Sequence, residues 1–203
     1  MLTRGDTEVR AEVFIVESLG KDDRREGKII ESILRMGGKH PVYRFVRTND
    51  DLKDAIEEFR ASKYRYLHVS SHGNDNEFYF RFGALRFKDF ADLLRTNLRH
   101  RRLFVSACEC VNSRFAKLLI PSSKCYSIIG PYEAIDFDVA AVMWASYYYL
   151  AFRNDQTSMN RRRILRRLKR LTSLFRVNLN YYFPNRRRIK RKRLTGTQRP
   201  THK

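Results

Sequence analysis

Residues 64–74 read Tyr-Arg-Tyr-Leu-His-Val-Ser-Ser-His-Gly-Asn, and the main features of the predicted fold follow from them. Residues 64–70 predict a strand that ends in a Ser-His-Gly-Asn turn, which places His72 just beyond the strand. A second apolar strand is predicted at residues 103–106 and is followed by Ala-Cys, which places Cys108 just beyond it. Two predicted strands therefore end next to reactive side chains.

Strands and helices alternate along most of the chain. Apolar runs predict further strands at residues 13–16, 42–46 and 126–129, and a hairpin at residues 78–82 and 84–87. Helical spacing predicts helices at residues 24–36, 88–94, 113–119 and 138–152, and one that Asn49 or Asp50 caps and that runs through Phe59. This alternation implies right-handed crossovers and a mainly parallel sheet. The predicted fold class is α/β, with a central sheet flanked by helices in three layers.

The formal net charge of +20 is spread unevenly. Of the 42 Lys and Arg residues, 17 lie in residues 156–203, which contain no Asp or Glu. The other 25 are nearly balanced by 22 acidic residues in residues 1–155. We predict a globular domain at residues 1–184 and a disordered basic tail at residues 185–203, where almost no side chain is able to pack.

Residues 159–175 place apolar side chains on one helical face and Arg and Lys on the other, which allows three interpretations. The helix could lie on an anionic membrane surface. Its arginines, with Tyr181 and Tyr182, could bind nucleic acid through phosphate neutralisation and stacking. We favour the third interpretation, a last helix of the globular domain, because the apolar face needs burial. The basic tail would then remain available for nucleic acid or other acidic surfaces.

Several classes of protein are not expected. Residues 1–10 contain no apolar stretch, so we expect no secretory signal. Residues 139–152 are the longest apolar-rich stretch and fall short of the roughly 20 residues of a membrane span. The odd set Cys108, Cys110 and Cys125 favours reduced thiols in a cytoplasm over a disulfide framework, and its spacing does not fit a zinc ribbon. We therefore expect a cytoplasmic protein without a metal or cofactor.

His72 and Cys108 have the chemistry of a nucleophilic pair. Functional groups in open parallel sheets lie just beyond the carboxyl ends of the strands, so the imidazole and thiol could face each other there. The imidazole would remove the thiol proton and the thiolate would attack a carbonyl, while the Gly73 backbone N–H could help to hold the oxyanion. The alternative is structural: a buried cysteine that packs as a small apolar side chain and a histidine that belongs only to a turn.

Residues 67–73 (Leu-His-Val-Ser-Ser-His-Gly), followed by residues 103–108 (Leu-Phe-Val-Ser-Ala-Cys), resemble the His-Gly and Ala-Cys pair of caspase-like (clan CD) cysteine peptidases. The similarity is greatest to the bacterial CHAT branch, which includes relatives of separase. The Ile-Ile-Gly at residues 128–130, the acidic segment after it and the Ala/Tyr-rich helix at residues 138–150 are also similar to the CHAT pattern. The resemblance covers about residues 12–183.

The resemblance implies a three-layer caspase-like fold and a cysteine endopeptidase that works through a thioester without a metal. His72 would be the general base, Cys108 the nucleophile, and the backbone N–H groups of Gly73 and Cys108 the oxyanion hole. The family needs no third triad member. Cys110 stands where a small residue is expected, and it is either buried or a resolving thiol.

The resemblance also places the pocket for the substrate residue before the scissile bond on loops after the first, nucleophile-bearing and following strands. These loops offer Glu17, Asp22, Asp23, Glu133, Asp136 and Asp138, so the local charge favours a basic substrate residue. The alternatives are that Asp136 or Asp138 caps the following helix and that residues 22–25 form a solvated loop.

The expected function is therefore a caspase-like endopeptidase of a protein substrate, within a bacterial defence or cell-death system as CHAT proteins often are. Any regulation is expected from a separate, activating partner chain. Two alternatives stay open: an inactive caspase-like module that binds protein or nucleic acid, and a nucleic-acid-binding protein that uses its basic C-terminal part.

Overall fold

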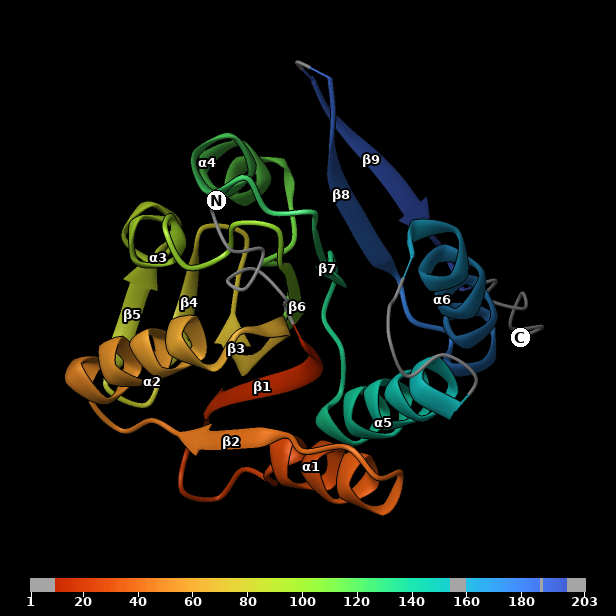
Figure 1. Cartoon of the computed structure of the whole chain (residues 1–203), viewed down its shortest axis with the longest axis horizontal. Coiled ribbons are helices and arrows are strands. Elements are labelled where there is room, and N and C mark those ends of the chain that lie inside the picture. The colour runs from red at the N-terminus through yellow and green to blue at the C-terminus, as the bar shows by residue number, and fades with distance from the viewer. Residues whose placement is uncertain (1–9, 154–159, 187, 197–203) are drawn as a thin grey trace, which may run out of the picture.

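The structure is a computed structural model that describes residues 10–153, 160–186 and 188–196. Seven strands follow one another across a sheet in the order β2-β1-β3-β6-β7-β8-β9, and the hairpin β4-β5 branches from the end of β3 (Figure 1). The strands are β1 (Arg10–Ser18), β2 (Val42–Phe45), β3 (Tyr64–Gly73), β4 (Glu77–Phe80), β5 (Gly83–Arg86), β6 (Arg102–Ser106), β7 (Ser127–Pro131), β8 (Leu179–Asn185) and β9 (Arg188–Leu194).

The sheet is parallel from β2 to β7, and β8 and β9 add two antiparallel strands. Six helices in the described residues flank it: α1 (Glu26–Met36), α2 (Asn49–Ser62), α3 (Phe87–Leu94), α4 (Ser113–Ser123), α5 (Phe137–Arg153) and α6 (Arg161–Phe175). The predicted α/β fold class, with a mainly parallel sheet between helices, is confirmed. In the described residues, no helix has the length and apolar character needed to cross a bilayer.

The two faces of the sheet carry separate apolar cores. Helices α2, α3 and α4 cover one face, and α1, α5 and α6 cover the other. Alternation along β1 shows the division, because Phe14 and Val16 join the first core while Val13 and Ile15 join the second. Both faces of the central strands are therefore buried, which is why these strands are continuous apolar runs in the sequence.

Local hydrogen bonding sets where helices begin. We expected Asn49 or Asp50 to cap α2, but the cap is Thr48, whose hydroxyl accepts the Asp51 N–H at 3.0 Å. The Asp51 carboxylate accepts the Thr48 N–H in return at 3.1 Å, which completes a capping box. The prediction was wrong by one residue because the reciprocal pair satisfies two helix-end donors at once.

Residues 185–203 were predicted to be a disordered basic tail, and this is wrong for residues 188–194. These residues form β9, which pairs with β8 over seven residues from Asn185↔Arg188 to Leu179↔Leu194. Ile189 packs against the core under α4, and Leu194 packs against the core under α6. Backbone pairing and two apolar anchors on opposite faces are enough to order the strand. Residues 197–203 lie outside the described residues.

Strand β8 continues through Pro184 to Asn185. The last pair that β8 makes with β7 is Ile128↔Tyr182. Beyond that pair, β8 has only β9 as a neighbour, so a residue without an N–H is tolerated there.

We predict that Phe78→Ala lowers the free energy of unfolding by about 3–5 kcal/mol, measured by urea denaturation. Phe78 is fully buried, and its ring packs against those of Phe87, Phe90 and Phe115 with centroids 4.7–5.5 Å away. Tyr79→Ala is the control, because that neighbour is 38% exposed and its loss should change stability by about 1 kcal/mol or less. Equal losses in the two variants would contradict this account of the core.

Candidate active site

The parallel pairing of β3 with β6 brings the two reactive residues to the same edge of the sheet. The register runs through Ser70↔Ser106, and His72 and Cys108 each follow two residues later. The chain segments remain in contact there, because a Cβ added to Gly73 would overlap Cys110 Sγ and lie 3.4 Å from the Cys108 carbonyl oxygen. The structure therefore places the backbone of Gly73 beside that of Cys108. His72 was predicted just beyond its strand, but it lies inside β3, which continues to Gly73 by pairing with β4.

The His72 ring is held from two sides. Its Nε2 lies 2.8 Å from Asp23 Oδ2, on the loop between β1 and α1. The ring also meets Phe137 edge to face, with centroids 4.9 Å apart. The side chain is 47% exposed, so it is oriented without being closed off from solvent. Because Nε2 faces the carboxylate, Nδ1 is the nitrogen that remains to exchange a proton.

Asp23 is ionised more readily than an ordinary aspartate. Partial burial opposes its ionisation, but hydrogen bonds from His72 and from the Gly20 backbone N–H outweigh that effect and lower the Asp23 pKa. The carboxylate therefore favours the tautomer in which His72 carries its proton on Nε2 and leaves Nδ1 able to accept one.

Cys108 lies partly exposed in the turn after β6. The Ile135 backbone N–H points at its sulfur from 3.5 Å, and the Ile135 carbonyl oxygen lies 3.7 Å from the same atom. The next residue, Glu109, has a φ of 59° and an exposed side chain, so the chain turns sharply just past the thiol.

The other two cysteines are buried. Cys110 is fully buried under Gly73, and burial together with the neighbouring Cys108 raises its pKa far above the usual thiol value. Burial raises the pKa of Cys125 to about 11. Both thiols are therefore poor nucleophiles at neutral pH.

The predicted acidic residues divide into two groups. Glu17 lies inside β1, not after it, and is fully buried, with its carboxylate accepting hydrogen bonds from the Gly27 N–H and the Tyr43 hydroxyl, each at 2.6 Å. It does not line an open surface. Asp22 is exposed on the β1–α1 loop, whereas Asp23 contacts His72 as described above.

Glu133, Asp136 and Asp138 are exposed on or beside the segment that joins β7 to α5. Glu133 accepts a hydrogen bond from the Asn178 amide at 2.7 Å, and Asp138 accepts the Val139 N–H at 2.8 Å. The Asp136 carbonyl accepts the Ala140 N–H at 2.9 Å in the first turn of α5. The same segment supplies Ile135 to Cys108 and Phe137 to His72, so these acids lie on the stretch of chain that contacts both residues of the candidate dyad.

A buried polar cluster below this edge was not predicted from the sequence. The Glu26 carboxylate accepts hydrogen bonds from Ser106 at 2.8 Å and Ser70 at 3.3 Å, and His68 Nε2 lies 3.3 Å from it. His68 Nδ1 lies 3.0 Å from the Tyr148 hydroxyl. The available signal was the alternation at residues 67–70, where His68 and Ser70 share the strand face that turns toward α1.

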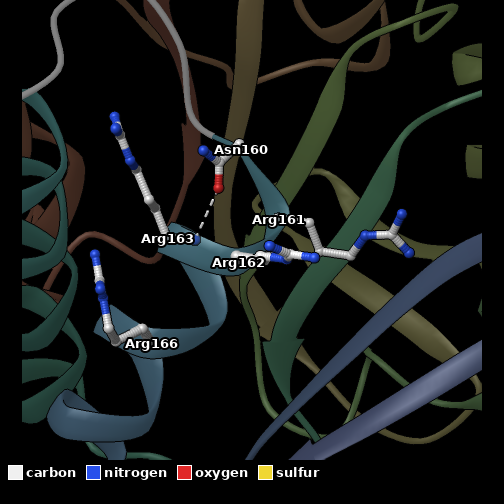
Figure 2. Close-up of a pocket in the computed structure, with 5 residues that line it drawn as sticks. All are labelled: Asn160, Arg161, Arg162, Arg163 and Arg166. Atoms are coloured by element: carbon white, nitrogen blue, oxygen red, sulfur yellow. Dashed lines mark hydrogen bonds between the residues drawn. The ribbon is translucent and has the colours of Figure 1, made fainter.

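A second charged feature lies at the start of α6. A cavity of about 690 Å³ is lined by Asn160, Arg161, Arg162, Arg163 and Arg166, and Figure 2 shows these arginine side chains spreading to both sides of the first turn. Asn160 caps the helix by accepting the Arg163 N–H at 2.9 Å.

Strand β9 extends this positive charge. The Arg161 guanidinium lies 4.4 Å from the centre of the Phe183 ring, and Phe183 pairs with Lys190 across the strands. We call the combined area the basic surface; it consists of Arg161, Arg162, Arg163, Arg166, Arg188, Lys190 and Lys192.

Within the described ranges, no three His, Cys, Asp or Glu side chains are grouped so that they could hold a metal ion. No protein-family model matches the chain, and no curated protein matches it. The crystal structure of protein GSU0716 from Geobacter sulfurreducens is similar, with 12% sequence identity, a TM-score of 0.46, and coverage of 93% of this chain and 95% of that chain. This similarity is too low to indicate a shared function.

We predict that Glu17→Gln gains stability over the wild type as the pH rises. Burial raises the Glu17 pKa above its ordinary value of 4.5, although the hydrogen bonds from Tyr43 and Gly27 oppose the shift. The protonated Glu17 carboxyl stabilises the folded state fully below the ordinary pKa of 4.5. That stabilisation is lost as the pH rises through the higher pKa of the folded state. The glutamine amide of the variant does not titrate, so the variant avoids this loss.

Urea denaturation from pH 4 to pH 8 measures the difference between the variant and the wild type. Glu57→Gln is the control, because Glu57 is exposed and its carboxylate pairs with Arg60 one turn away at 2.6 Å. A difference between Glu17→Gln and the wild type that stays constant with pH would contradict the prediction.

Proposed function

We propose that this chain is a caspase-like cysteine endopeptidase with a His72/Cys108 dyad. The observation that supports the proposal most directly is the parallel β3–β6 register through Ser70↔Ser106, because His72 near the end of β3 and Cys108 just after β6 each follow two residues later. The contact between Asp23 and His72 and the partial exposure of Cys108 support it. The buried states of Cys110 and Cys125 leave Cys108 as the accessible thiol of the three.

The mechanism follows from these positions. His72 Nδ1 takes the proton of Cys108, and the thiolate attacks the carbonyl carbon of the peptide bond. The backbone N–H groups of Gly73 and Cys108 would hold the resulting oxyanion. Collapse breaks the C–N bond, the leaving amine takes the proton from His72, and a thioester remains. Water then attacks the thioester with His72 as the base, which releases the acid and restores the thiol.

The proposed substrate is a protein with a basic residue before the scissile bond. Glu133, Asp136 and Asp138 support this preference, because they are exposed beside the segment that contacts the dyad. A cytoplasmic location and a role in a bacterial defence or cell-death system are part of the same proposal and rest on the resemblance to CHAT proteins.

Covalent labelling with Arg-, Lys- and Asp-directed acyloxymethyl ketone probes tests the proposal. We expect the wild type to be labelled at Cys108, with the Arg or Lys probe faster than the Asp probe. Cys108→Ala should abolish labelling, and His72→Ala should slow it by about 100-fold or more because the general base is lost. Cys110→Ala is the control and should leave the site of labelling unchanged.

If no probe labels Cys108, even with cell lysate added to supply an activating partner, the peptidase proposal is wrong. An inactive interaction module would then be the better description. Labelling that is fastest with the Asp probe would retain the dyad and overturn the basic preference.

We predict that Asp23→Ala slows labelling of Cys108 by about tenfold, because His72 loses the group that orients its ring and selects its tautomer. Asp22→Ala is the matched control, since it removes the adjacent but exposed carboxylate. The thermal midpoints of both variants should stay close to that of the wild type. Equal labelling rates for the two variants would show that Asp23 plays no part in positioning His72.

Nucleic-acid binding is a second candidate function, and the basic surface favours it. This surface joins the first turn of α6 to β9, and its lysines and arginines are exposed on both elements. Such an arrangement fits the neutralisation of a phosphate backbone.

We predict that a labelled single-stranded DNA of about 30 nucleotides binds with an affinity that falls steeply with salt. The double variant Arg162→Glu/Lys190→Glu should reduce the slope of log affinity against log salt by about 2, measured by fluorescence anisotropy. The control is Lys53→Glu/Lys88→Glu, which makes the same charge change on α2 and α3. Identical slopes for both double variants would rule out the basic surface as the contact.

A further inference from the structure

Large apolar side chains are exposed together on one side of the molecule. They are Ile29 on α1 (45% exposed), Val142 (52%), Tyr149 (47%) and Leu150 (38%) on α5, and Leu174 on α6 (72%). Of the nine exposed large apolar side chains in the described residues, five belong to this group. Single exposed apolar residues are ordinary, but a contiguous group of this kind marks an interaction site.

The group surrounds a hollow between three helices. Helix α1 packs against α5, and α5 packs against α6, so the three lie along the same side of the sheet (Figure 1). The hollow has a volume of about 490 Å³. We call it the apolar groove; it is lined by Ile29, Ile33, Val142, Ala145, Ser146, Tyr149, Leu150, Leu171 and Leu174.

The border of the apolar groove is positively charged. Helix α6 contains seven Arg or Lys residues and no Asp or Glu, and the exposed Arg170 lies one turn before Leu174. On α1, the Glu31 carboxylate is already paired with Lys28 at 2.8 Å and with Arg35 at 2.9 Å. Helix α5 has one acidic residue, Asp138, in its first turn.

The shape of the apolar groove favours a helical occupant. A helix presents a narrow apolar ridge with residues at i, i+3, i+4 and i+7, and such a ridge fits a hollow between helices. A membrane surface is flat and suits a protruding apolar face, so it could not reach the floor formed by Ile33, Ala145 and Leu171. A nucleic acid would meet apolar side chains where it needs polar or stacking contacts.

We propose that the apolar groove is the docking site for an amphipathic helix of a partner protein, one whose polar face is acidic. The apolar ridge of that helix would cover Val142, Leu150 and Leu174, and its carboxylates would face the basic side of α6 at Arg170. The site contains neither His72 nor Cys108. It therefore stands apart from the peptidase proposal and can be tested in a Cys108→Ala background.

The probe is a fluorescein-labelled helical peptide of about 18 residues, with Leu on one face and Glu at the other positions. A second peptide carries Lys in place of every Glu. Fluorescence anisotropy should show saturable binding of the Glu peptide and at least about tenfold weaker binding of the Lys peptide.

Leu150→Glu should weaken binding of the Glu peptide by about tenfold or more. Leu118→Glu on α4 is the matched control, because Leu118 is 41% exposed and Leu150 is 38% exposed. It should leave the affinity unchanged. Arg170→Glu should weaken the Glu peptide and strengthen the Lys peptide, which a merely structural role of Arg170 would not produce.

Absence of saturable binding by the Glu peptide would overturn the proposal, as would equal weakening by Leu150→Glu and Leu118→Glu. Three further outcomes would assign the groove to a different occupant and also overturn it. They are binding to anionic phospholipid vesicles that Leu150→Glu abolishes, self-association in sedimentation that the same variant abolishes, and peptide binding that begins only when residues 1–9 or 197–203 are removed.

Discussion

The carboxylate of Glu26 joins the first helix to the centre of the sheet. It is 1% exposed and accepts hydrogen bonds from Ser106 on β6 and Ser70 on β3, and His68 links it onward to Tyr148 on α5. Two strands and two helices therefore share one buried polar centre. Such a cluster is stable only when every member has a partner, because a buried donor or acceptor left alone costs about 1–3 kcal/mol. The cluster thereby restricts how α1 can sit above the ends of β3 and β6.

Much of the fold could be predicted because burial leaves a simple pattern in the sequence. Central strands such as β6 are buried on both faces, so they are short apolar runs between helical segments. Strand β9 could not be predicted in this way, because five of its seven residues are Arg or Lys. Its order comes from backbone pairing with β8 and from Ile189 and Leu194, and composition does not show either.

The backbone placement of the two candidate dyad residues follows from a similar pattern. Cys108 follows β6 and His72 lies near the end of β3, and parallel strands bring such residues to one edge of the sheet. The partner of His72 could not be predicted, because Asp22 and Asp23 look alike in the sequence. The β1–α1 loop alone decides that Asp23 contacts the ring while Asp22 faces solvent. Glu17 was placed on a loop because the apolar run ends at Val16, but the strand continues to Ser18.

Strand β9 also protects the sheet from joining another copy of itself. A strand at the end of a sheet offers unpaired backbone groups to any other strand, and lysines are a common defence against this. Two β9 edges brought together would set five cations against five within strand-pairing distance. The Debye length is about 10 Å at 0.1 M salt and about 3 Å at 1 M, so this repulsion acts at physiological ionic strength and fades in concentrated salt. The charges proposed to contact nucleic acid thus also oppose the pairing of a second strand with β9.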